Sequence, residues 1–262
     1  MKEINKKINK VRMGIIEATY NAKEGHIASA FSILDILWVL YDRILNIDPS
    51  DLDNPDRDRF ILSKGHASLG LYGVLSEKGF FDKNLLKDFG KYDSPLGGHP
   101  DRNKVPGVEA SAGSLGHGMP IAVGIAMGLK IKKSKAHVFC IIGDGEANEG
   151  TIWESALLAS HHSLSNLCCI IDHNHSTDRA LKVDSLSDKF KSFGWNVYEV
   201  DGHNHEEIYD ILSAENCNDN PKIVIANTIK GKGIKLMENN PSWHHKAPSP
   251  EEMSQFLSEL KV

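Results

Sequence analysis

Two side chains that carry oxygen ligands, Asp144 and Asn174, come shortly after two apolar runs of the sequence. The runs cover residues 138–142 and 167–171, and neither alternates with polar residues, which is typical of strands buried on both faces of a parallel sheet. Residues 149–162 between them have helical spacing, so the stretch predicts strand, helix, strand. Because neighbouring parallel strands end at one edge of a sheet, we expect Asp144 and Asn174 to lie together there.

The chemistry of these two side chains is that of a hard cation site. Carboxylate, amide and backbone carbonyl oxygens suit Mg²⁺ or Ca²⁺ rather than zinc. Magnesium usually completes its coordination with water and phosphate oxygens, and the glycines at 143 and 145 let a backbone approach a phosphate closely. The sequence therefore predicts a metal–diphosphate site. The alternative is that Gly-Asp-Gly is only a tight turn and Asn174 only a helix cap.

Composition places the chain among globular proteins. Its 262 residues are 40 % hydrophobic and 25 % charged, which predicts one large α/β domain covering residues 1–262. The net charge is −5 and no basic block is present, which argues against nucleic acid as a partner. An anionic cofactor therefore cannot be held by bulk charge, and a metal ion is the simpler device.

Targeting signals and cysteine spacing bear on location. We find no signal peptide and no transmembrane run, so we expect no membrane partner and a cytoplasmic location. Cys140, Cys168, Cys169 and Cys217 have no CxxC spacing. The first three lie in predicted core strands, so we interpret them as buried thiols in a reducing compartment.

The predicted elements alternate between strands and helices. The expected fold class is α/β, an open, mostly parallel sheet with helices on both faces. Strands are expected at 60–62, 138–142, 167–171, 196–200 and 222–227, and helices at 3–22, 32–45, 149–162, 186–193, 206–214 and 250–260. A further helix is expected to end at 78, and another is opened by residues 113–118. A small-residue turn is expected at 24–29, a long loop at 93–112, and a closing loop at 228–245.

Many of the 13 histidines stand beside glycine in predicted turns. Those with this placement are His26, His66, His99, His117 and His203. Imidazole can donate to phosphate or hydroxyl oxygens and can transfer protons near neutral pH. The alternatives are solvated or structural histidines, or a zinc site. Zinc is disfavoured because no pair shares a helix at HxxxH spacing and no cysteine lies nearby.

Five separate stretches resemble transketolase. They read GHIASA, DRFILSKGHASLGLY, GGHPDRNKVPGVEASAGSLGHG, GDGEANEGTIWESALLASHHSLSNLCCIIDHN, and TIKGKGI followed by ENNPSWHHKAP. In the fourth, Gly-Asp-Gly is followed by Asn174 thirty residues after Asp144, which resembles the thiamine diphosphate motif. Nearly the whole chain, from about residue 5 to 258, is similar to the N-terminal, diphosphate-binding domain of that family.

The resemblance implies roles for individual residues. The metal, Mg²⁺ or Ca²⁺, would be held by Asp144, Asn174 and the backbone carbonyl of Ser176. The residues that match cofactor-binding positions for thiamine diphosphate are His66, Gly116, His117, Gly143, Gly145, Glu149, Asn174 and His244. The catalytic histidines lining the substrate channel would be His26, His99 and His244. Glu149 also matches an acidic residue at the interface between subunits.

The resemblance also implies a partner. Catalysis in the family needs a glutamate of the pyrimidine-binding domain, and this chain ends at Val262, just after its first domain. It therefore resembles the N-terminal subunit of a split transketolase, which works with a separate C-terminal subunit in an assembly of two copies of each. The implied activity is transfer of a two-carbon glycolaldehyde unit from a ketose to an aldose. The substrates would be sugars, sugar phosphates or sugar sulfonates.

Two departures from the family pattern lie near the expected mouth of the site. Residues 177–181 replace the usual turn after the asparagine, and His245 replaces a glycine. We expect both to contact the far end of the substrate and so affect substrate choice, with Arg179 as an anion ligand.

Two other functions stay open. One is another thiamine diphosphate reaction, such as carboligation of the deoxyxylulose phosphate synthase kind. The other is a non-catalytic, regulatory subunit that binds metal and diphosphate.

Overall fold

A single parallel sheet organises the chain. The computed structural model describes residues 2–178, 180–216 and 218–261. The sheet has the strand order β1-β2-β3-β5-β4, and every neighbouring pair is parallel. The strands are β1 (Arg59–Leu62), β2 (Val138–Gly143), β3 (Leu167–His173), β4 (Asn196–Asp201) and β5 (Lys222–Asn227). The expected α/β class and the five expected strands are confirmed.

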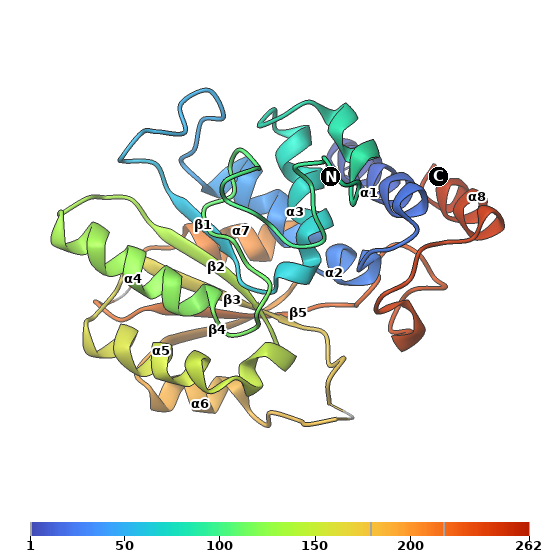
Figure 1. Ribbon diagram of the computed structural model, residues 1–262. Coiled ribbons are helices and arrows are strands. Elements are labelled where there is room, and N and C mark those ends of the chain that lie inside the picture. Colours follow the sequence, from blue (N-terminus) through green and yellow to red (C-terminus); the bar gives the residue numbers. More distant parts are fainter. Residues whose placement is uncertain (1, 179, 217, 262) are drawn as a thin grey trace.

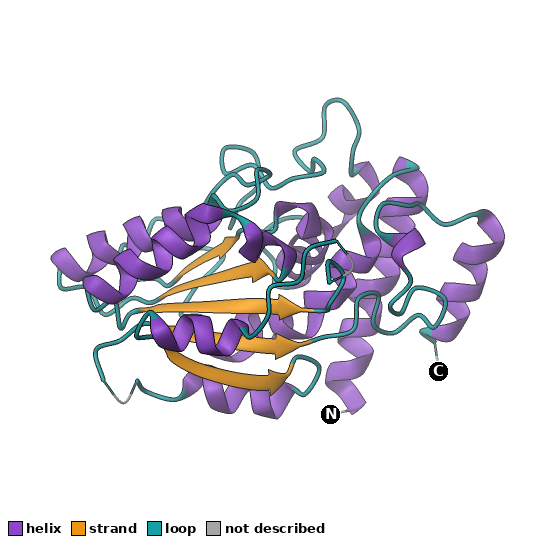
Figure 2. Ribbon diagram, turned by 90° about the horizontal axis from the view of Figure 1, so that it is seen from below, coloured by secondary structure: helices purple, strands orange, loops and turns teal. Residues whose placement is uncertain are grey.

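Helices cover both faces of this sheet (Figures 1 and 2). They are α1 (Lys2–Ala22), α2 (Ile27–Val39), α3 (Ser68–Glu77), α4 (Gly118–Ile131), α5 (Gly150–His161), α6 (Leu186–Ser192), α7 (His205–Ser213) and α8 (Pro250–Glu259). In Figure 1, α4, α5 and α6 lie below the sheet, and α1, α2, α3 and α7 lie on its other side. The sheet therefore separates two apolar cores.

The two cores follow from the alternation of side chains along each strand. On β2, Phe139 and Ile141 join the core under α1, α2 and α3, whereas Val138, Cys140 and Ile142 join the core under α4 and α5. All six residues of β2 are buried. This explains why the central strands read as continuous apolar runs without alternation.

The second helix begins earlier than we expected. The turn expected at 24–29 ends at His26, and α2 starts at Ile27. Small residues permit this, because Gly70 of α3 lies so close to Ala30 that an added Cβ would come within 3.1 Å of the Ala30 carbonyl oxygen. The helix that we expected to end at residue 45 consists of α2, which ends at Val39, and a π-helical turn that follows it, Leu40–Ile44. The predicted turn was therefore wrong for residues 27–29, and the helix begins at 27 instead of the expected 32.

Three of the four cysteines are buried free thiols, Cys140, Cys168 and Cys169, as predicted. Burial raises the pKa of the Cys168 thiol to about 12, so it behaves as a small apolar side chain. Cys217 lies outside the described residues. Within the described part of the chain, none of the helices is both long and apolar enough to cross a lipid bilayer.

The two ends of the described chain meet on the sheet face that carries α1. Helix α8 packs on α1, and the Asn9 side-chain amide donates to the Leu260 carbonyl at 3.2 Å. Ser249 starts α8 with a capping box shared with Glu252. The closing loop, residues 228–245, connects β5 to α8 and crosses the N-terminus of α2, where the Gly231 amide donates to the Ala28 carbonyl at 3.0 Å.

Candidate functional site

Asp144 lies at the C-terminal end of β2 with one carboxylate oxygen free. It is only 7 % exposed. Its Oδ1 accepts the Gly145 amide at 2.7 Å, whereas its Oδ2 is buried and has no hydrogen-bond partner among the described residues. Burial, and then the nearby Asp172 carboxylate, raises the pKa of Asp144. A buried, unpaired carboxylate oxygen is costly unless a cation or a proton joins it.

Asn174 lies one residue beyond the end of β3, next to Asp144. The pairing of Gly143 with Asp172 places the two strand ends side by side, as we expected. The Asn174 amide group donates to Asp172 at 2.9 Å and to Ser32 at 3.1 Å. These two bonds leave Oδ1 as the acceptor, and it accepts the Ser176 amide at 3.0 Å. His175 takes a left-handed backbone, with φ of 59°, to make this turn.

Asp172 is a fully buried carboxylate that our reading of the sequence did not assign to the site. It accepts from the Lys64 ammonium, the Thr228 hydroxyl, the Ser32 hydroxyl and the Asn174 amide. Burial alone would raise the pKa of Asp172, but Lys64 and the hydrogen bonds hold it below its ordinary value. Asp172 therefore fixes the orientation of Asn174. The available signal was an aspartate ending an apolar run two residues before that asparagine.

The donor set at these strand ends fits a hard cation. We call Asp144, Asn174 and the Ser176 carbonyl the strand-end site. It offers a buried carboxylate oxygen without a hydrogen-bond partner among the described residues and an amide oxygen held in place by its neighbours, and the Ser176 carbonyl stays the third ligand that the sequence predicts. Such oxygens suit Mg²⁺, which needs few protein ligands. No three His, Cys, Asp or Glu side chains gather as metal ligands in the described ranges. The zinc alternative therefore has no cluster to support it.

Glu146 joins three segments around the strand-end site, and our sequence reading did not assign it to the site either. Its carboxylate accepts the Ser63 hydroxyl and the amides of Gly116 and Gly143, at 2.8 and 3.0 Å. Burial raises the pKa of Glu146. The Ser63 oxygen in turn accepts the Gly118 amide at the first residue of α4. Glu146 therefore fixes the start of α4 against the ends of β1 and β2.

Gly116 is a backbone position that a larger residue cannot occupy. Its φ is 80°, and an added Cβ would lie 2.5 Å from the Thr151 hydroxyl and 2.7 Å from the Glu149 Cβ. Its carbonyl accepts the Thr151 hydroxyl at 2.8 Å. The loop before α4 is therefore locked onto the start of α5. Of the other expected cofactor residues here, Glu149 and His117 are exposed.

Residues 177–181, which replace the usual turn after the asparagine, contact the turn that follows β2. Thr177 and Leu181 make these contacts. The Thr177 methyl lies 2.4 Å from the place of a Cβ on residue 145, so Thr177 covers Gly145. The Asn148 side-chain amide donates to the Leu181 carbonyl at 3.3 Å. The segment therefore reaches the edge of the strand-end site. Arg179 lies outside the described residues, and its expected role as an anion ligand stays a prediction.

Four histidines from three segments meet near the N-terminus of α2, and we call them the histidine cluster. They are His26, His66, His244 and His245. The ring of His26 lies 5.2 Å from that of His66, 5.3 Å from that of His244 and 4.5 Å from that of His245. A cavity of about 230 Å³ is lined by His26, His66 and His245 together with His99. The structure thus brings together His26, His66, His99 and His244 with His245 of the closing loop, whereas His117 is exposed and His203 bonds to Asp35.

Burial and mutual repulsion favour the neutral form of these rings. Burial, followed by the neighbouring rings and Lys230, lowers the pKa of His26 to about 4. Burial, followed by Lys64, lowers the pKa of His66 to about 2. The same two kinds of cause lower the pKa of His244. Neutral imidazoles can each donate one hydrogen bond and accept another.

Lys230 of the closing loop sets the orientation of His244. Its ammonium lies 2.9 Å from Nδ1 of His244. Since an ammonium only donates, Nδ1 accepts, and the ring proton of neutral His244 is on Nε2. Burial and Lys64 lower the pKa of Lys230 to about 8. His244 therefore presents an N–H donor on the side away from Lys230.

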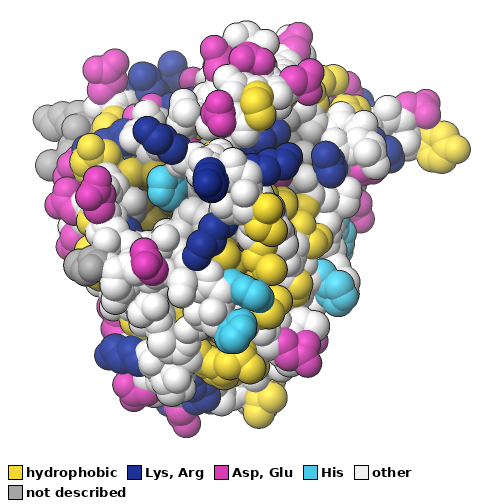
Figure 3. Space-filling model, turned by 90° about the vertical axis from the view of Figure 1, so that its left-hand side faces the viewer, with side chains coloured by type: hydrophobic (Ala, Val, Ile, Leu, Met, Phe, Trp, Pro, Cys, Tyr) yellow, Lys and Arg dark blue, Asp and Glu magenta, His cyan; other side chains and the backbone are white. Residues whose placement is uncertain are grey.

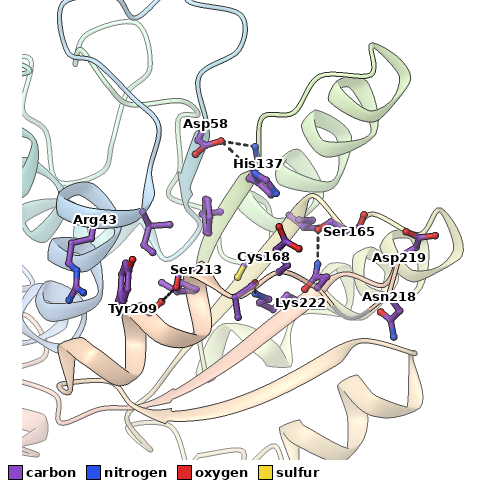
Figure 4. A pocket seen from close by; sticks show the side chains of 17 residues that line it. Arg43, Asp58, His137, Ser165, Cys168, Tyr209, Ser213, Asn218, Asp219 and Lys222 are labelled. Atoms are coloured by element: carbon purple, nitrogen blue, oxygen red, sulfur yellow. Dashed lines mark hydrogen bonds and ion pairs between the residues drawn. The ribbon is translucent and has the colours of Figure 1, made fainter.

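A larger cavity, of about 740 Å³, lies at the opposite edge of the sheet (Figure 4). It is lined by Phe139, Cys168 and Lys222, near the N-terminal ends of β2, β3 and β5. Ligands of open α/β sheets bind at the other edge. The Lys222 ammonium is already bound to the carbonyls of Ile211 and Ala214, at 2.9 and 2.6 Å. We therefore place the functional site at the strand-end site and not here.

The fold and the strand-end site together define an open α/β domain that binds a phosphorylated cofactor at the carboxyl ends of its strands. The family description "Transketolase, thiamine diphosphate binding domain" matches residues 4–260. The chain belongs to this family. The expectation of a thiamine diphosphate-binding domain of the transketolase kind is therefore confirmed.

Two relatives match the chain along almost its whole length. Both are named as one subunit of a transketolase. That of the apulose-4-phosphate transketolase of Actinobacillus succinogenes is 42 % identical, over 99 % of this chain and 96 % of that protein. The 6-deoxy-6-sulfo-D-fructose transketolase subunit SqwG of a Clostridium species is 34 % identical over the same shares. The chain thus corresponds in extent to single subunits of transketolases, as the sequence predicted.

A solved structure agrees with this assignment. Transketolase from Campylobacter jejuni superposes with a TM-score of 0.91 at 28 % identity. The match covers 100 % of this chain and 43 % of that one. The chain therefore spans less than half the length of that solved transketolase.

Proposed function

We propose that this chain is the diphosphate-binding subunit of a thiamine diphosphate-dependent transketolase that moves a two-carbon ketol unit from a ketose to an aldose. The observation that carries the proposal is the buried, unpaired Oδ2 of Asp144 beside the oriented Asn174, at two adjacent strand ends. The single sheet with a core on each face supports treating residues 1–262 as one domain.

In this proposal the strand-end site holds Mg²⁺ against the cofactor's diphosphate. Asp144 supplies charge, Asn174 supplies its amide oxygen, and Ser176 supplies its carbonyl. The cofactor residues would be His66, Gly116, His117, Gly143, Gly145, Glu149 and His244, as expected from the sequence. When bound, thiamine diphosphate supplies the carbanion chemistry that breaks and forms the carbon–carbon bond.

The chain's own histidines would handle the substrate. His26, His99 and His244 would donate to sugar hydroxyls and transfer protons at the reacting carbonyl. Support comes from the distance of 5.3 Å between the rings of His26 and His244 and from the cavity that His26 and His99 line together. Because the pKa of His26 and of His244 is lowered, both would be neutral near pH 7, and His244 would present its Nε2–H as a donor because its Nδ1 accepts from Lys230.

A second subunit would complete this site. At the described strand ends, Asp144 would hold the metal and Glu146 is bound by three donors, so we propose that the catalytic glutamate comes from the second subunit. An apolar face on α4 and α5 suits the docking of a partner. Ile131 is 79 % exposed and Leu157 60 % exposed. Figure 3 shows hydrophobic side chains in the open among charged ones on one side of the molecule. We propose two copies of each subunit.

The substrate class is proposed from the relatives. Their names specify one sugar phosphate and one sulfo sugar, so we propose a ketose with an anionic far end as donor. Thr177 covers Gly145 and so holds residues 177–181 beside the strand-end site, from where they would contact the anionic far end of the ketose. Screening the reconstituted enzyme against phosphorylated, sulfonated and unmodified ketoses checks this. Equal turnover of unmodified ketoses would contradict it.

The test of the proposed function is reconstitution. We expect the purified chain to be catalytically silent with saturating Mg²⁺ and thiamine diphosphate, and ketol transfer to appear when a subunit with the pyrimidine-binding domain is added. Robust turnover by this chain alone, with no partner detected by mass spectrometry, would show that the catalytic carboxylate lies within it. Carboligation from pyruvate by the reconstituted pair, without ketol transfer, would replace transketolase with another thiamine diphosphate reaction.

A further inference from the structure

A buried charged cluster lies behind the functional site, where α1, α2 and the segment after β4 meet. Its centre is Asp35 of α2, whose side chain is 9 % exposed. Oδ2 of Asp35 lies 3.1 Å from Arg12 Nη2 and 2.9 Å from His203 Nδ1, and Oδ1 lies 2.8 Å from His205 Nε2. The hydrogen bonds to both histidines hold the pKa of Asp35 below its ordinary value against the effect of burial.

The two histidines of this cluster differ in what their second nitrogen does. Nε2 of His203 accepts the backbone amide of Ile229 at 2.8 Å. Since that nitrogen accepts, the proton of His203 is on Nδ1, where it is donated to Asp35. Asp35 therefore selects the tautomer of His203 that can receive a backbone amide. His205 bonds to the same carboxylate through its Nε2 and does not bond to Ile229.

Ile229 stands between two residues that reach the functional site. On one side, the Thr228 hydroxyl donates to Asp172, which orients Asn174. On the other side, Lys230 donates to Nδ1 of His244. The start of the closing loop is thus held at neighbouring backbone amides: that of Thr228 donates to the His173 carbonyl at 3.1 Å, that of Ile229 to His203, and that of Gly231 to the Ala28 carbonyl at 3.0 Å. The bond from Ile229 lies between Thr228 and Lys230, so its loss would loosen the segment that carries both side chains.

We propose that Asp35 and His203 form a positioning pair that holds the start of the closing loop, so that Thr228 and Lys230 present Asp172 and His244 correctly. Neither residue touches the cofactor or the substrate. The proposal rests on the proposed function for its effect on cofactor binding, but its structural half, the bond from Ile229 to His203, stands independently.

Three variants of the full chain separate the roles. His203→Gln keeps an acceptor near the place of Nε2, whereas His203→Asn keeps a donor near the place of Nδ1 and loses the acceptor. His205→Ala removes a donor from the same carboxylate without touching Ile229, and is the matched control. Loss of one backbone hydrogen bond in a buried place is expected to speed exchange of the Ile229 amide about tenfold.

The first measurement is hydrogen exchange of the segment around Ile229. We expect faster exchange in His203→Asn, and near wild-type exchange in His203→Gln and His205→Ala. The second is the cofactor dependence of the reconstituted enzyme. His203→Asn should raise the KM for thiamine diphosphate by about tenfold with kcat unchanged at saturation.

The outcomes distinguish this inference from the proposed function. Wild-type exchange in His203→Asn, or equal loosening in His205→Ala, would overturn the positioning role. Faster exchange in His203→Asn together with an unchanged KM for thiamine diphosphate would show that the closing loop does not affect cofactor binding, and would also overturn the proposal. If the wild-type chain binds no thiamine diphosphate at all, the proposed function fails, while the exchange comparison still decides whether His203 holds Ile229.

Discussion

The free oxygen of Asp144 gives the sharpest test at the scale of single residues. We expect Asp144→Asn to weaken Mg²⁺-dependent binding of thiamine diphosphate by about a hundredfold, because the charge facing the cation is lost. The fold should persist, since burial raises the pKa of Asp144 and its charge is costly without a cation. Titration calorimetry measures the affinity, with the exposed Asp184→Asn as control. Unchanged affinity in Asp144→Asn would remove the metal role.

The histidine cluster predicts a stability that falls in acid. The pKa of His26 is about 4 and that of His66 about 2, both below the ordinary 6.5. Between pH 6.5 and these pKa values, the unfolded chain binds more protons than the folded chain. The contribution of the neutral rings to the free energy of unfolding is therefore fully present above about pH 6.5 and is lost as the pH falls. Urea unfolding from about pH 7.5 to about pH 5 measures this. His66→Gln should make the free energy of unfolding depend less on pH. The control is His161→Gln at an exposed position, which should leave that dependence unchanged.

At the scale of elements, the loop before α4 admits no side chain at Gly116. We expect Gly116→Ala to lower the free energy of unfolding by on the order of 2 kcal/mol or more, because φ is positive and the new Cβ would overlap Thr151 and Glu149. Gly124→Ala, in the middle of α4 with no atom within 4 Å of the added Cβ, should instead raise it by about 0.5–1 kcal/mol. Equal effects of the two changes would contradict this account.

The central elements were predictable from the sequence because their signals are local. The apolar runs of β2 and β3 are buried on both faces, and Asp144 and Asn174 follow them directly. The start of α2 was missed because Ala28, Ser29 and Ala30 look like a turn until α3 packs against them. Asp172 and Glu146 were missed because their partners, such as Lys64 and Ser63, are distant in sequence.

At the scale of the whole molecule, the proposed function assigns to this chain one part of an active centre. The strand-end site and the histidine cluster lie at one edge of the sheet, and the exposed apolar residues of α4 and α5 lie on one of its faces. This division agrees with the length of the chain, whose match covers 43 % of the transketolase from Campylobacter jejuni and 96 % of the relative from Actinobacillus succinogenes.

The packing of α8 on α1 has a consequence for the order in which the chain acquires its structure. Helix α1 is made before the rest of the described chain, yet the Asn9 side chain can bond to the Leu260 carbonyl only after α8 has been made, and β1 can pair only with β2, almost eighty residues later. Contacts of such separation form slowly. We expect the amides of α1 to gain protection late in refolding, after those of β2, β3 and β5. Pulse-labelled hydrogen exchange would measure this order, and early protection of α1 would refute it. Until α8 is made, the nascent chain would expose to chaperones the part of α1 that α8 covers in the folded protein.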